Sequence, residues 1–241
     1  SWEGRELWLW QLGDGPLTLV LVGGIHGGYE GNTVVLVESL VAYFRRHPDD
    51  ILPGVRLMII PAANPDGLAR SSELEGRFNA HGVDLNRNWA YDWSPEAYLR
   101  DIPVDPGPRP FSEPETLALR SFFIETDPAA VLFYHSALGA IFLGAHHRNG
   151  RPAWLGELLS DATGYPYEVS FGYYEVTGDA ANWLVERGTP AAIIELESRD
   201  SPEFERNLAG VIALQCYFAL AEQESGEIFD RLDEAVRRLC Q

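Results

Sequence analysis

Residues 17–30 of the chain read LTLVLVGGIHGGYE, and this stretch contains the strongest signals for the fold: a strand, a glycine-rich turn and the start of a helix. Its first part, residues 17–23, is a nearly continuous apolar run, as expected for a strand that is buried on both faces. Glycines then permit a sharp turn, and apolar residues recur at helical spacing over 30–46. A strand that runs directly into a helix is a building unit of α/β domains.

The same alternation of strands and helices continues along the chain. It favours an α/β fold in a single domain over residues 1–241, with a mainly parallel or mixed sheet covered by helices on both faces. Functional residues are then expected in loops beyond the strand ends. Further strands are predicted at 55–61, 129–135, 140–144 and 190–196, and helices from Ser112 and over 151–162, 178–187, 203–221 and 225–240.

Two segments depart from this alternation. Residues 5–11 read as a strand, and Gly13-Asp14-Gly15-Pro16 after it has turn chemistry, which predicts a hairpin with the strand at 17–23. Residues 62–111 read as a long irregular stretch rich in Gly, Pro, Asn and Trp. Such loops are uncommon in compact domains and are usually functional where they occur.

Composition narrows the classes of function. The net charge is -18, from 18 basic and 36 acidic residues, so the basic face that nucleic acids or anionic membranes require is not expected. The apolar run at 209–221 is interrupted by Gln215 and predicts a buried helix, not a membrane span. Cys216 and Cys240 are compatible with a disulfide or with two thiols. The chain begins at Ser1 without an initiator Met, as either a trimmed chain or a mature product would.

Two clusters carry candidate metal ligands. His26 and Glu30 lie in the glycine-rich turn after the first long strand, and His135 lies at the end of the strand at 129–135. Two imidazoles and one carboxylate suit zinc and leave a fourth position open for water, which is the pattern of a catalytic site. In sequence alone, a helix-capping acid and a core histidine would look the same.

The apolar strand at 190–196 contains one carboxylate, Glu195. Burial of an unpaired acid is costly, and a role as general base beside a metal-bound water would explain it. Glu197 shares a face with Glu195, so the strand alone does not choose between them, and an acid exposed at the strand end stays an alternative.

The irregular stretch contains Asn64-Pro65-Asp66-Gly67, then Arg77 and Asn79, then Gly-Val-Asp-Leu-Asn-Arg-Asn at 82–88. Guanidinium groups bind carboxylates through two parallel hydrogen bonds and can stabilise an oxyanion. The alternative is a loop held by Asn and Asp turns whose arginines are solvated.

These motifs, with Ser-Glu-Pro-Glu-Thr at 112–116, His135-Ser136 and the strand that ends near Glu195, resemble the zinc carboxypeptidase family. That family includes pancreatic carboxypeptidases A and B and bacterial murein-peptide enzymes, and this chain is similar to a short bacterial member. The motifs occur in the family's order over roughly residues 20–197. The resemblance implies an eight-stranded mixed sheet between helices, with one zinc ion per chain at its carboxyl edge.

The resemblance also implies roles for individual residues. Zinc would be held by His26, Glu30 and His135, and Glu195 would take a proton from the zinc-bound water and pass it to the leaving amine. Arg77 would stabilise the oxyanion, Asn86 and Arg87 would hold the substrate's terminal carboxylate, and Ser136 would contact the substrate. Tyr174 would close over the substrate, with Tyr173 as an adjacent competitor.

One departure from the family pattern concerns the first motif. The family has two residues between His and Glu, whereas three separate His26 from Glu30 in this chain. A bulge absorbed by Gly27 and Gly28 would keep Glu30 as a ligand. Tyr29 as a zinc ligand is the alternative and is much less common chemistry.

The predicted function is therefore a zinc metallocarboxypeptidase that acts on peptides with a free C-terminal carboxylate. Asp179 falls in the pocket segment and would favour basic C-terminal residues or murein-type peptides ending in diaminopimelate; capping of the helix at 178–187 is the competing interpretation. Alternatives are an amidohydrolase of small N-acyl amino acids, or an inactive zinc-binding homologue. No nucleic acid or membrane insertion is expected, and an extracellular or cell-envelope location is favoured.

Overall fold

The computed structural model describes residues 1–144, 152–168, 171–225 and 239–240. Within them, a seven-stranded sheet has the strand order β1-β3-β2-β6-β9-β7-β8, and β4 and β5 form a separate pair. The strands are β1 Trp10–Leu12, β2 Leu17–Val22, β3 Val55–Ile60, β4 Ala97–Leu99, β5 Ile102–Val104, β6 Ala130–Ser136, β7 Ala140–Leu143, β8 Tyr167–Glu168 and β9 Ala191–Leu196.

The centre of the sheet is parallel, as the sequence predicts. Strands β3, β2, β6 and β9 run in one direction, and the outer strands β1 and β7 pair antiparallel with β3 and β9. The fold class, a mixed and mostly parallel sheet between helices, is thereby confirmed. The expected number of strands, eight, is wrong for the described residues. The main sheet has seven strands there, because β4 and β5 pair with each other in a separate sheet.

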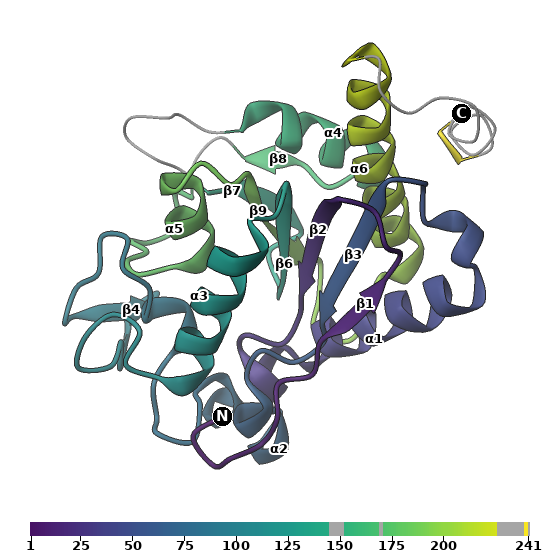
Figure 1. Cartoon of the computed structure of the whole chain (residues 1–241). Helices are drawn as coiled ribbons and strands as arrows, with labels where there is room; N and C mark the ends of the chain where they lie inside the picture. Colours follow the sequence, from purple (N-terminus) through teal and green to yellow (C-terminus); the bar gives the residue numbers. More distant parts are fainter. Residues whose placement is uncertain (145–151, 169–170, 226–238, 241) are drawn as a thin grey trace.

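Helices cover both faces of the sheet (Figure 1). Alternate residues of β2 explain the two layers: Leu19 and Leu21 are buried in one apolar cluster, and Val20 and Val22 in the other. The first cluster packs beneath α1, α4 and α6, and the second beneath α3 and α5. The helices are α1 Gly31–Arg46, α2 Pro65–Arg70, α3 Pro114–Thr126, α4 Ala153–Thr163, α5 Ala180–Glu186 and α6 Phe204–Ser225.

The predicted hairpin between the first two strands is wrong. Strand β1 pairs with β3, and β2 pairs with the other side of β3, so the connecting turn crosses the start of β3. This crossing explains Gly15, where a Cβ atom would lie 1.9 Å from the carbonyl carbon of Gly54. The glycines therefore allow close passage of one backbone over another, and a tight hairpin turn would show the same signal in the sequence.

The stretch at 62–111 is less irregular than predicted. It contains α2, two short 3₁₀ turns, η3 Leu74–Arg77 and η4 Leu85–Arg87, and the β4–β5 pair. Each element is too short for hydrophobic periodicity to reveal it. Asn64 begins α2 by accepting a hydrogen bond from the Gly67 backbone N–H at 2.9 Å, so the Asn-Pro-Asp-Gly motif is a helix start.

The C-terminal part is held by buried polar contacts and a disulfide. Gln215 on α6 accepts a hydrogen bond from Leu52 N at 3.0 Å, which explains a polar residue within the apolar run. Cys216 is bonded to Cys240, so the disulfide is the alternative that the structure supports. The predicted helix at 225–240 lies almost wholly outside the described residues. No helix in the described parts of the chain is long and apolar enough to cross a membrane.

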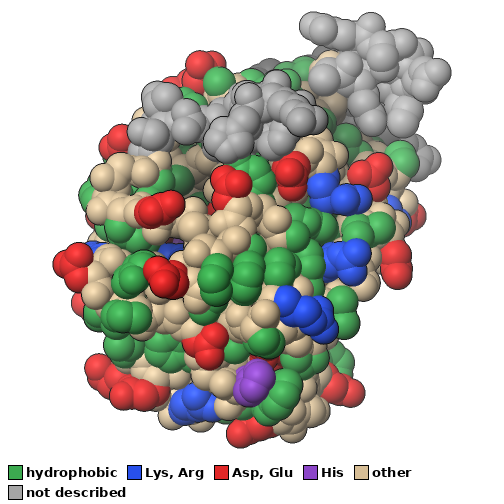
Figure 2. All heavy atoms as spheres, turned by 90° about the vertical axis from the view of Figure 1, so that its left-hand side faces the viewer, with side chains coloured by type: hydrophobic (Ala, Val, Ile, Leu, Met, Phe, Trp, Pro, Cys, Tyr) green, Lys and Arg blue, Asp and Glu red, His purple; other side chains and the backbone are tan. Residues whose placement is uncertain are grey.

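The surface reflects the acidic composition. Figure 2 shows acidic side chains distributed across the face of the molecule that lies at the left of Figure 1, and the basic side chains visible there are fewer. Because carboxylates are in excess, a Lys or Arg side chain without a carboxylate partner is less expected in this protein than in one with equal numbers of acidic and basic residues.

Candidate metal centre and substrate pocket

The side chains singled out in the sequence come together at the carboxyl ends of the parallel strands. Glycine-rich η1, Gly27–Glu30, follows β2, His135 lies near the end of β6, and Glu195 lies opposite it on β9. They share one cavity of about 430 Å³. Its lining includes His26, Glu30, Arg77, Asn86, Arg87, His135, Ser136, Tyr174, Asp179 and Glu195.

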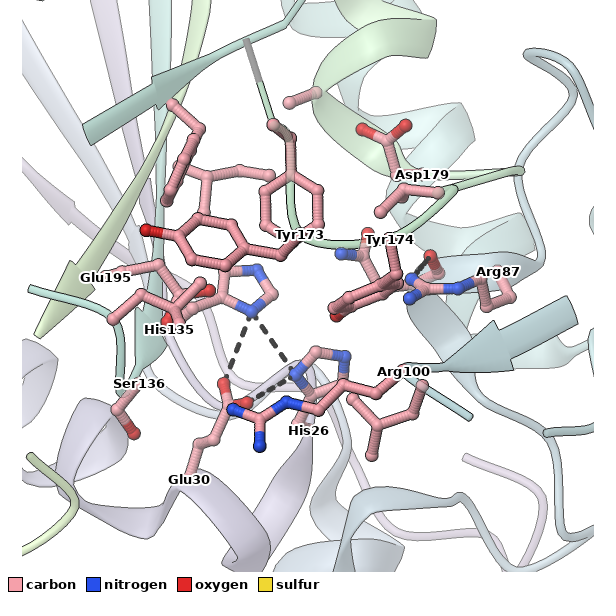
Figure 3. A pocket seen from close by; sticks show the side chains of 18 of the residues that line it. His26, Glu30, Arg87, Arg100, His135, Ser136, Tyr173, Tyr174, Asp179 and Glu195 are labelled. Carbon is pink, nitrogen blue, oxygen red and sulfur yellow. Dashed lines mark hydrogen bonds and ion pairs between the residues drawn. The ribbon is translucent and has the colours of Figure 1, made fainter. Parts of the chain in front are cut away.

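Three of these side chains meet at short distances (Figure 3). His26 Nδ1 lies 2.8 Å from Glu30 Oε1, and His135 Nδ1 lies 3.2 Å from Glu30 Oε2 and 3.2 Å from His26 Nδ1. All three residues are buried, and together they could hold a metal ion. Burial alone would raise the pKa of Glu30, but His26 and His135 together lower it below its ordinary value.

The triad fits a zinc ion. Ligand atoms about 2.0–2.1 Å from a tetrahedral zinc ion lie roughly 3.3 Å from one another. The two histidine Nδ1 atoms are 3.2 Å apart, which is close to that spacing, and each of them lies 2.8 or 3.2 Å from a different oxygen of Glu30. Glu30 Oε2 is also buried, and it accepts no hydrogen bond although His135 Nδ1 lies 3.2 Å away; a cation bound between these side chains would explain this.

The extra residue in the first motif is accommodated by two glycines. Gly27 has a φ of 47°, and a Cβ atom there would lie 2.5 Å from Gly76 O. At Gly28, a Cβ atom would lie 2.2 Å from Ser71 O. Both neighbours are backbone atoms that cannot move aside cheaply, so the turn requires glycine at both positions. The resulting bulge brings Glu30 into contact with His26, as the first of the two alternatives expects.

Asp84 stands behind this triad and beside Arg77. Its Oδ1 lies 3.5 Å from His26 Nε2, and its Oδ2 accepts a hydrogen bond from Arg77 Nε at 2.8 Å. A carboxylate on the second nitrogen of a ligand histidine fixes the orientation of the ring. Burial opposes ionisation of Asp84, but Arg77 and His26 hold its pKa well below the ordinary value.

We expect Asp84→Asn to lower the free energy of unfolding of the metal-free protein by up to about 3–5 kcal/mol at pH 7, because it removes the nearer of the two carboxylates that compensate the buried Arg77 charge and leaves only Glu30, at 3.6 Å. The pKa of Asp84 is depressed in the folded state. Its stabilisation is therefore complete above the ordinary aspartate pKa of 3.8 and is lost as the pH falls from there through the folded-state pKa. Urea denaturation at pH 7 and near pH 3 would show the difference from wild type shrinking. Asp101→Asn, at an exposed site, is the control; equal effects of the two changes at pH 7 would contradict the prediction.

Arg87 lies at the opposite end of the cavity from Ser136 (Figure 3), and its neighbour in the chain, Asn86, lines the cavity as well. Arg87 is buried, and its guanidinium donates to the carbonyl oxygens of Asn86 at 2.8 Å and Tyr98 at 3.1 Å. Its Nε is buried without a partner. Backbone carbonyls orient this guanidinium without neutralising it, so it can receive a carboxylate.

The geometry distinguishes the two tyrosine candidates. The Tyr174 ring lies 6.0 Å from the guanidinium carbon of Arg87, whereas Tyr173 is 58% exposed and packs on Phe142 and Phe171. Burial raises the pKa of Tyr174, and nearby Arg87 opposes that shift. Tyr174 therefore places a neutral hydroxyl group beside Arg87, at the cationic end of the cavity. This position favours Tyr174 over Tyr173 as the residue that would close over the substrate.

The two acids of β9 and its end are also distinguished. Glu197 is exposed and pairs with Arg206 at 2.6 Å, outside the cavity. Glu195 lines the cavity, and its Oε2 is buried without a partner. Burial, with the charge of Glu30 added to it, raises the pKa of Glu195 to about 7. A carboxyl group with a pKa near 7 can accept and return a proton at neutral pH.

Asp179 and Ser136 lie at the two ends of the site. Asp179 is the N-cap of α5 and accepts a hydrogen bond from Asn182 N at 2.9 Å, so the capping interpretation is correct. It lines the cavity as well, above Arg87 in Figure 3, and burial raises its pKa. Ser136 Oγ donates to Asn32 Oδ1 at 3.0 Å, in a contact that links β6 to the start of α1.

The sequence patterns assign no role to three residues of this neighbourhood. Asp84 belongs to the motif at 82–88, and an acid in a loop beside Arg and Asn is a signal that could have marked it. Asn32 and Arg199 have no pattern that marks them, because their contacts depend on the loop after β9 returning to α1 and to Tyr29 of η1.

Residues 1–149, more than half of the chain, match the family model described as zinc carboxypeptidase. The chain is a member of the zinc carboxypeptidase family. The resemblance drawn from the motifs is thereby confirmed, and the family is zinc-dependent, which agrees with the donor set of His26, Glu30 and His135.

Individual members of the zinc carboxypeptidase family give a scale for the similarity. Murein peptide amidase A of Escherichia coli K12 is 32% identical over 180 residues, which span 69% of this chain and 66% of that protein. The crystal structure of murein-tripeptide amidase from Escherichia coli O157 has 28% identity and a TM-score of 0.63, and covers 84% of this chain and 82% of that one. Bovine thrombin-activatable fibrinolysis inhibitor, at 18% identity, shares the fold with a TM-score of 0.78 over 92% and 88% of the chains.

Proposed function

We propose that this protein is a zinc-dependent carboxypeptidase that hydrolyses the amide bond before a C-terminal residue whose carboxylate is free. The buried guanidinium of Arg87 is the observation that supports this proposal most strongly. It shares the cavity with the His26, Glu30 and His135 triad, and hydrogen bonds to backbone carbonyls hold it there. A fixed cation at one end of a metal site selects substrates that end in an anion.

The residues divide the work of hydrolysis. A zinc ion held by His26, Glu30 and His135 would polarise the scissile carbonyl and lower the pKa of water. Glu195, with its pKa raised to about 7, would accept the proton of the attacking water and return it to the leaving amine. Arg77, held by Asp84, would stabilise negative charge on the carbonyl oxygen.

The finer substrate class we propose is a murein-type peptide. Support comes from the 32% identity to murein peptide amidase A. Asp179 lines the cavity close enough to Arg87 for the two charges to interact, so a residue bound by Arg87 would bring a cationic side chain toward Asp179. A C-terminal diaminopimelate carries such an amino group, as do basic residues. The Cys216–Cys240 disulfide supports an extracellular or cell-envelope location, where disulfides persist.

Cleavage of matched peptides tests the proposal. We expect the zinc-loaded protein to release the C-terminal residue of a free-acid peptide, to leave the corresponding C-terminal amide intact, and to lose activity with a chelator. Within a panel of basic, acidic, apolar and diaminopimelate C-termini, we expect Asp179→Asn to weaken preference for the amino group while Asn still caps α5.

Other outcomes would contradict particular parts of the proposal. Equal cleavage of acid and amide would rule out an exopeptidase. Cleavage of N-acyl amino acids alone would indicate a small-molecule amidohydrolase. Zinc binding without hydrolysis of any of these substrates would indicate an inactive homologue.

A further inference from the structure

Arg199 is a cation of the cavity wall to which the proposed chemistry gives no role. It lies in the loop after β9, is exposed, and lines the cavity together with Tyr29. Its guanidinium carbon lies 3.6 Å from the centroid of the Tyr29 ring. A guanidinium stacked on an aromatic ring keeps its N–H groups in one plane at the ring edge, where they can donate to an anion.

Among the described residues, Arg199 contacts no carboxylate. Its charge lowers the pKa of Glu195 less than the charges of His135 and Arg77 do, and the neighbouring acid Glu197 pairs with Arg206 at 2.6 Å. The chain as a whole has twice as many acidic as basic residues, 36 against 18. An arginine that faces the cavity, has no ion pair to a described residue in so acidic a protein and is held by stacking on an aromatic ring is suited to bind an anion.

The loop that carries Arg199 is fixed to the metal site. Asn32, two residues after Glu30, donates from Nδ2 to Ser198 O at 2.8 Å and to Ser201 O at 3.0 Å. Its Oδ1 accepts the hydrogen bond from Ser136 Oγ. One buried amide thus connects the Arg199 loop, the end of β6 and the start of α1. The position of Arg199 is therefore defined by the same elements that position the triad.

This anchoring also decides on which side of the metal site Arg199 lies. Figure 3 shows the triad between Arg87 on one side and Ser136 on the other. Through Asn32, the Arg199 loop is joined to the Ser136 side. A substrate whose terminal carboxylate is bound by Arg87 and whose scissile amide lies at the triad extends past it toward Arg199. The residue on the acyl side of the scissile bond is the part that reaches this region.

The geometry points to Arg199, stacked on Tyr29, as a second anion subsite, which binds a carboxylate on the acyl-side residue of the substrate. This inference rests on the proposed function, because the direction of the substrate is set by Arg87. It narrows the substrate class to peptides with two carboxylates, one on each side of the scissile amide.

The test uses two peptides that are identical except for Glu or Gln at the acyl-side position. For the zinc-loaded wild-type protein, we expect kcat/KM to be about five- to tenfold higher for the Glu peptide at low salt, as for a charge-assisted hydrogen bond at a partly exposed site. The ratio should approach one near 1 M NaCl, because salt screens exposed charges. Arg199→Gln should reduce the ratio to about one, and Arg199→Lys should give an intermediate value.

Arg100→Gln is the matched control, since Arg100 is another exposed arginine of the same cavity wall. It should retain the wild-type Glu/Gln ratio. A wild-type ratio near one, or an unchanged ratio in Arg199→Gln, would overturn the inference. Loss of the ratio in Arg100→Gln but not in Arg199→Gln would do so as well.

Calorimetric binding of both peptides to zinc-loaded Glu195→Gln separates this inference from the proposed function. If the Glu peptide binds more tightly than the Gln peptide, and this difference is lost when Arg199 is also replaced, the subsite is supported. That conclusion would hold even if the wild-type protein cleaved C-terminal acids and amides equally. Equal binding of the Glu and Gln peptides would overturn the subsite even if carboxypeptidase activity were established.

Discussion

Glu195→Gln is expected to reduce kcat for a free-acid peptide by about 10³- to 10⁴-fold, the upper part of the range that a general base contributes. Glu195 is the cavity carboxyl whose pKa is raised to about 7, mainly by burial, and its Oε2 has no protein partner. Gln has nearly the same shape but cannot accept the proton of attacking water. The change should therefore act on the chemical step and leave substrate binding intact. Single-turnover kinetics together with peptide binding would show this division.

Glu197→Gln is the control for this experiment, because Glu197 belongs to the same strand end but is exposed and pairs with Arg206. It should keep kcat within about twofold of wild type, as expected for loss of an exposed ion pair. Zinc content of both variants should equal that of wild type, since neither residue belongs to the triad. If Glu195→Gln retained kcat within tenfold, Glu195 would not be the general base.

Periodicity and motif order predicted most of the fold and the site. The buried strands β2, β6 and β9 are short apolar runs, and the glycine-rich turn after β2 signals where the first strand becomes a helix. Since parallel strands end at one edge of the sheet, these signals also place the chemistry of η1 near that of His135 and Glu195. Local sequence patterns are therefore sufficient to predict those parts of the site that lie at the ends of adjacent parallel strands.

Features that depend on contacts between distant segments could not be predicted. The turn at Gly15 has the chemistry of a hairpin, and only the position of β3 between β1 and β2 shows that it is a crossing. The role of Asn32 depends on two carbonyls more than 160 residues away in the chain, at separations of 166 and 169. Arg199 has no sequence signal because its partner is the ring of Tyr29, which lies in a distant segment of the chain.

The turn between His26 and Glu30 joins the metal site to the proposed anion subsite. It holds one residue more than the family motif, and Gly27 accommodates it in a left-handed conformation with a φ of 47°. The three candidate ligands still lie together, and Tyr29 of the same turn provides the aromatic ring on which Arg199 stacks. The longer turn therefore retains the metal ligands while one of its residues supports the proposed anion subsite.

Replacement of Arg87 is the second change for which we expect a large effect. Arg87→Gln should lower kcat/KM for a free-acid peptide by about 10²- to 10³-fold, because a buried carboxylate that loses its charged partner costs several kcal/mol. The loss should lie mainly in KM if the terminal carboxylate is bound equally in the ground and transition states, and in kcat if this contact also aligns the scissile bond. Measuring both constants for the acid and for the matching C-terminal amide distinguishes these cases.

The amide is the informative comparison, because it lacks the charge that Arg87 recognises. Cleavage of the amide should be slow in wild type and little changed in Arg87→Gln, so that the acid-to-amide preference falls from about 10²-fold or more toward one. Arg87→Lys restores the charge without the planar fork that donates to Asn86 O and Tyr98 O, and should recover only part of the preference. A preference that survived in Arg87→Gln would mean that another group of the cavity reads the carboxylate. Arg100 is exposed, whereas Arg87 is buried and donates to two backbone carbonyls. The fixed position of Arg87, together with its charge, can therefore make the protein specific for substrates with a free C-terminal carboxylate.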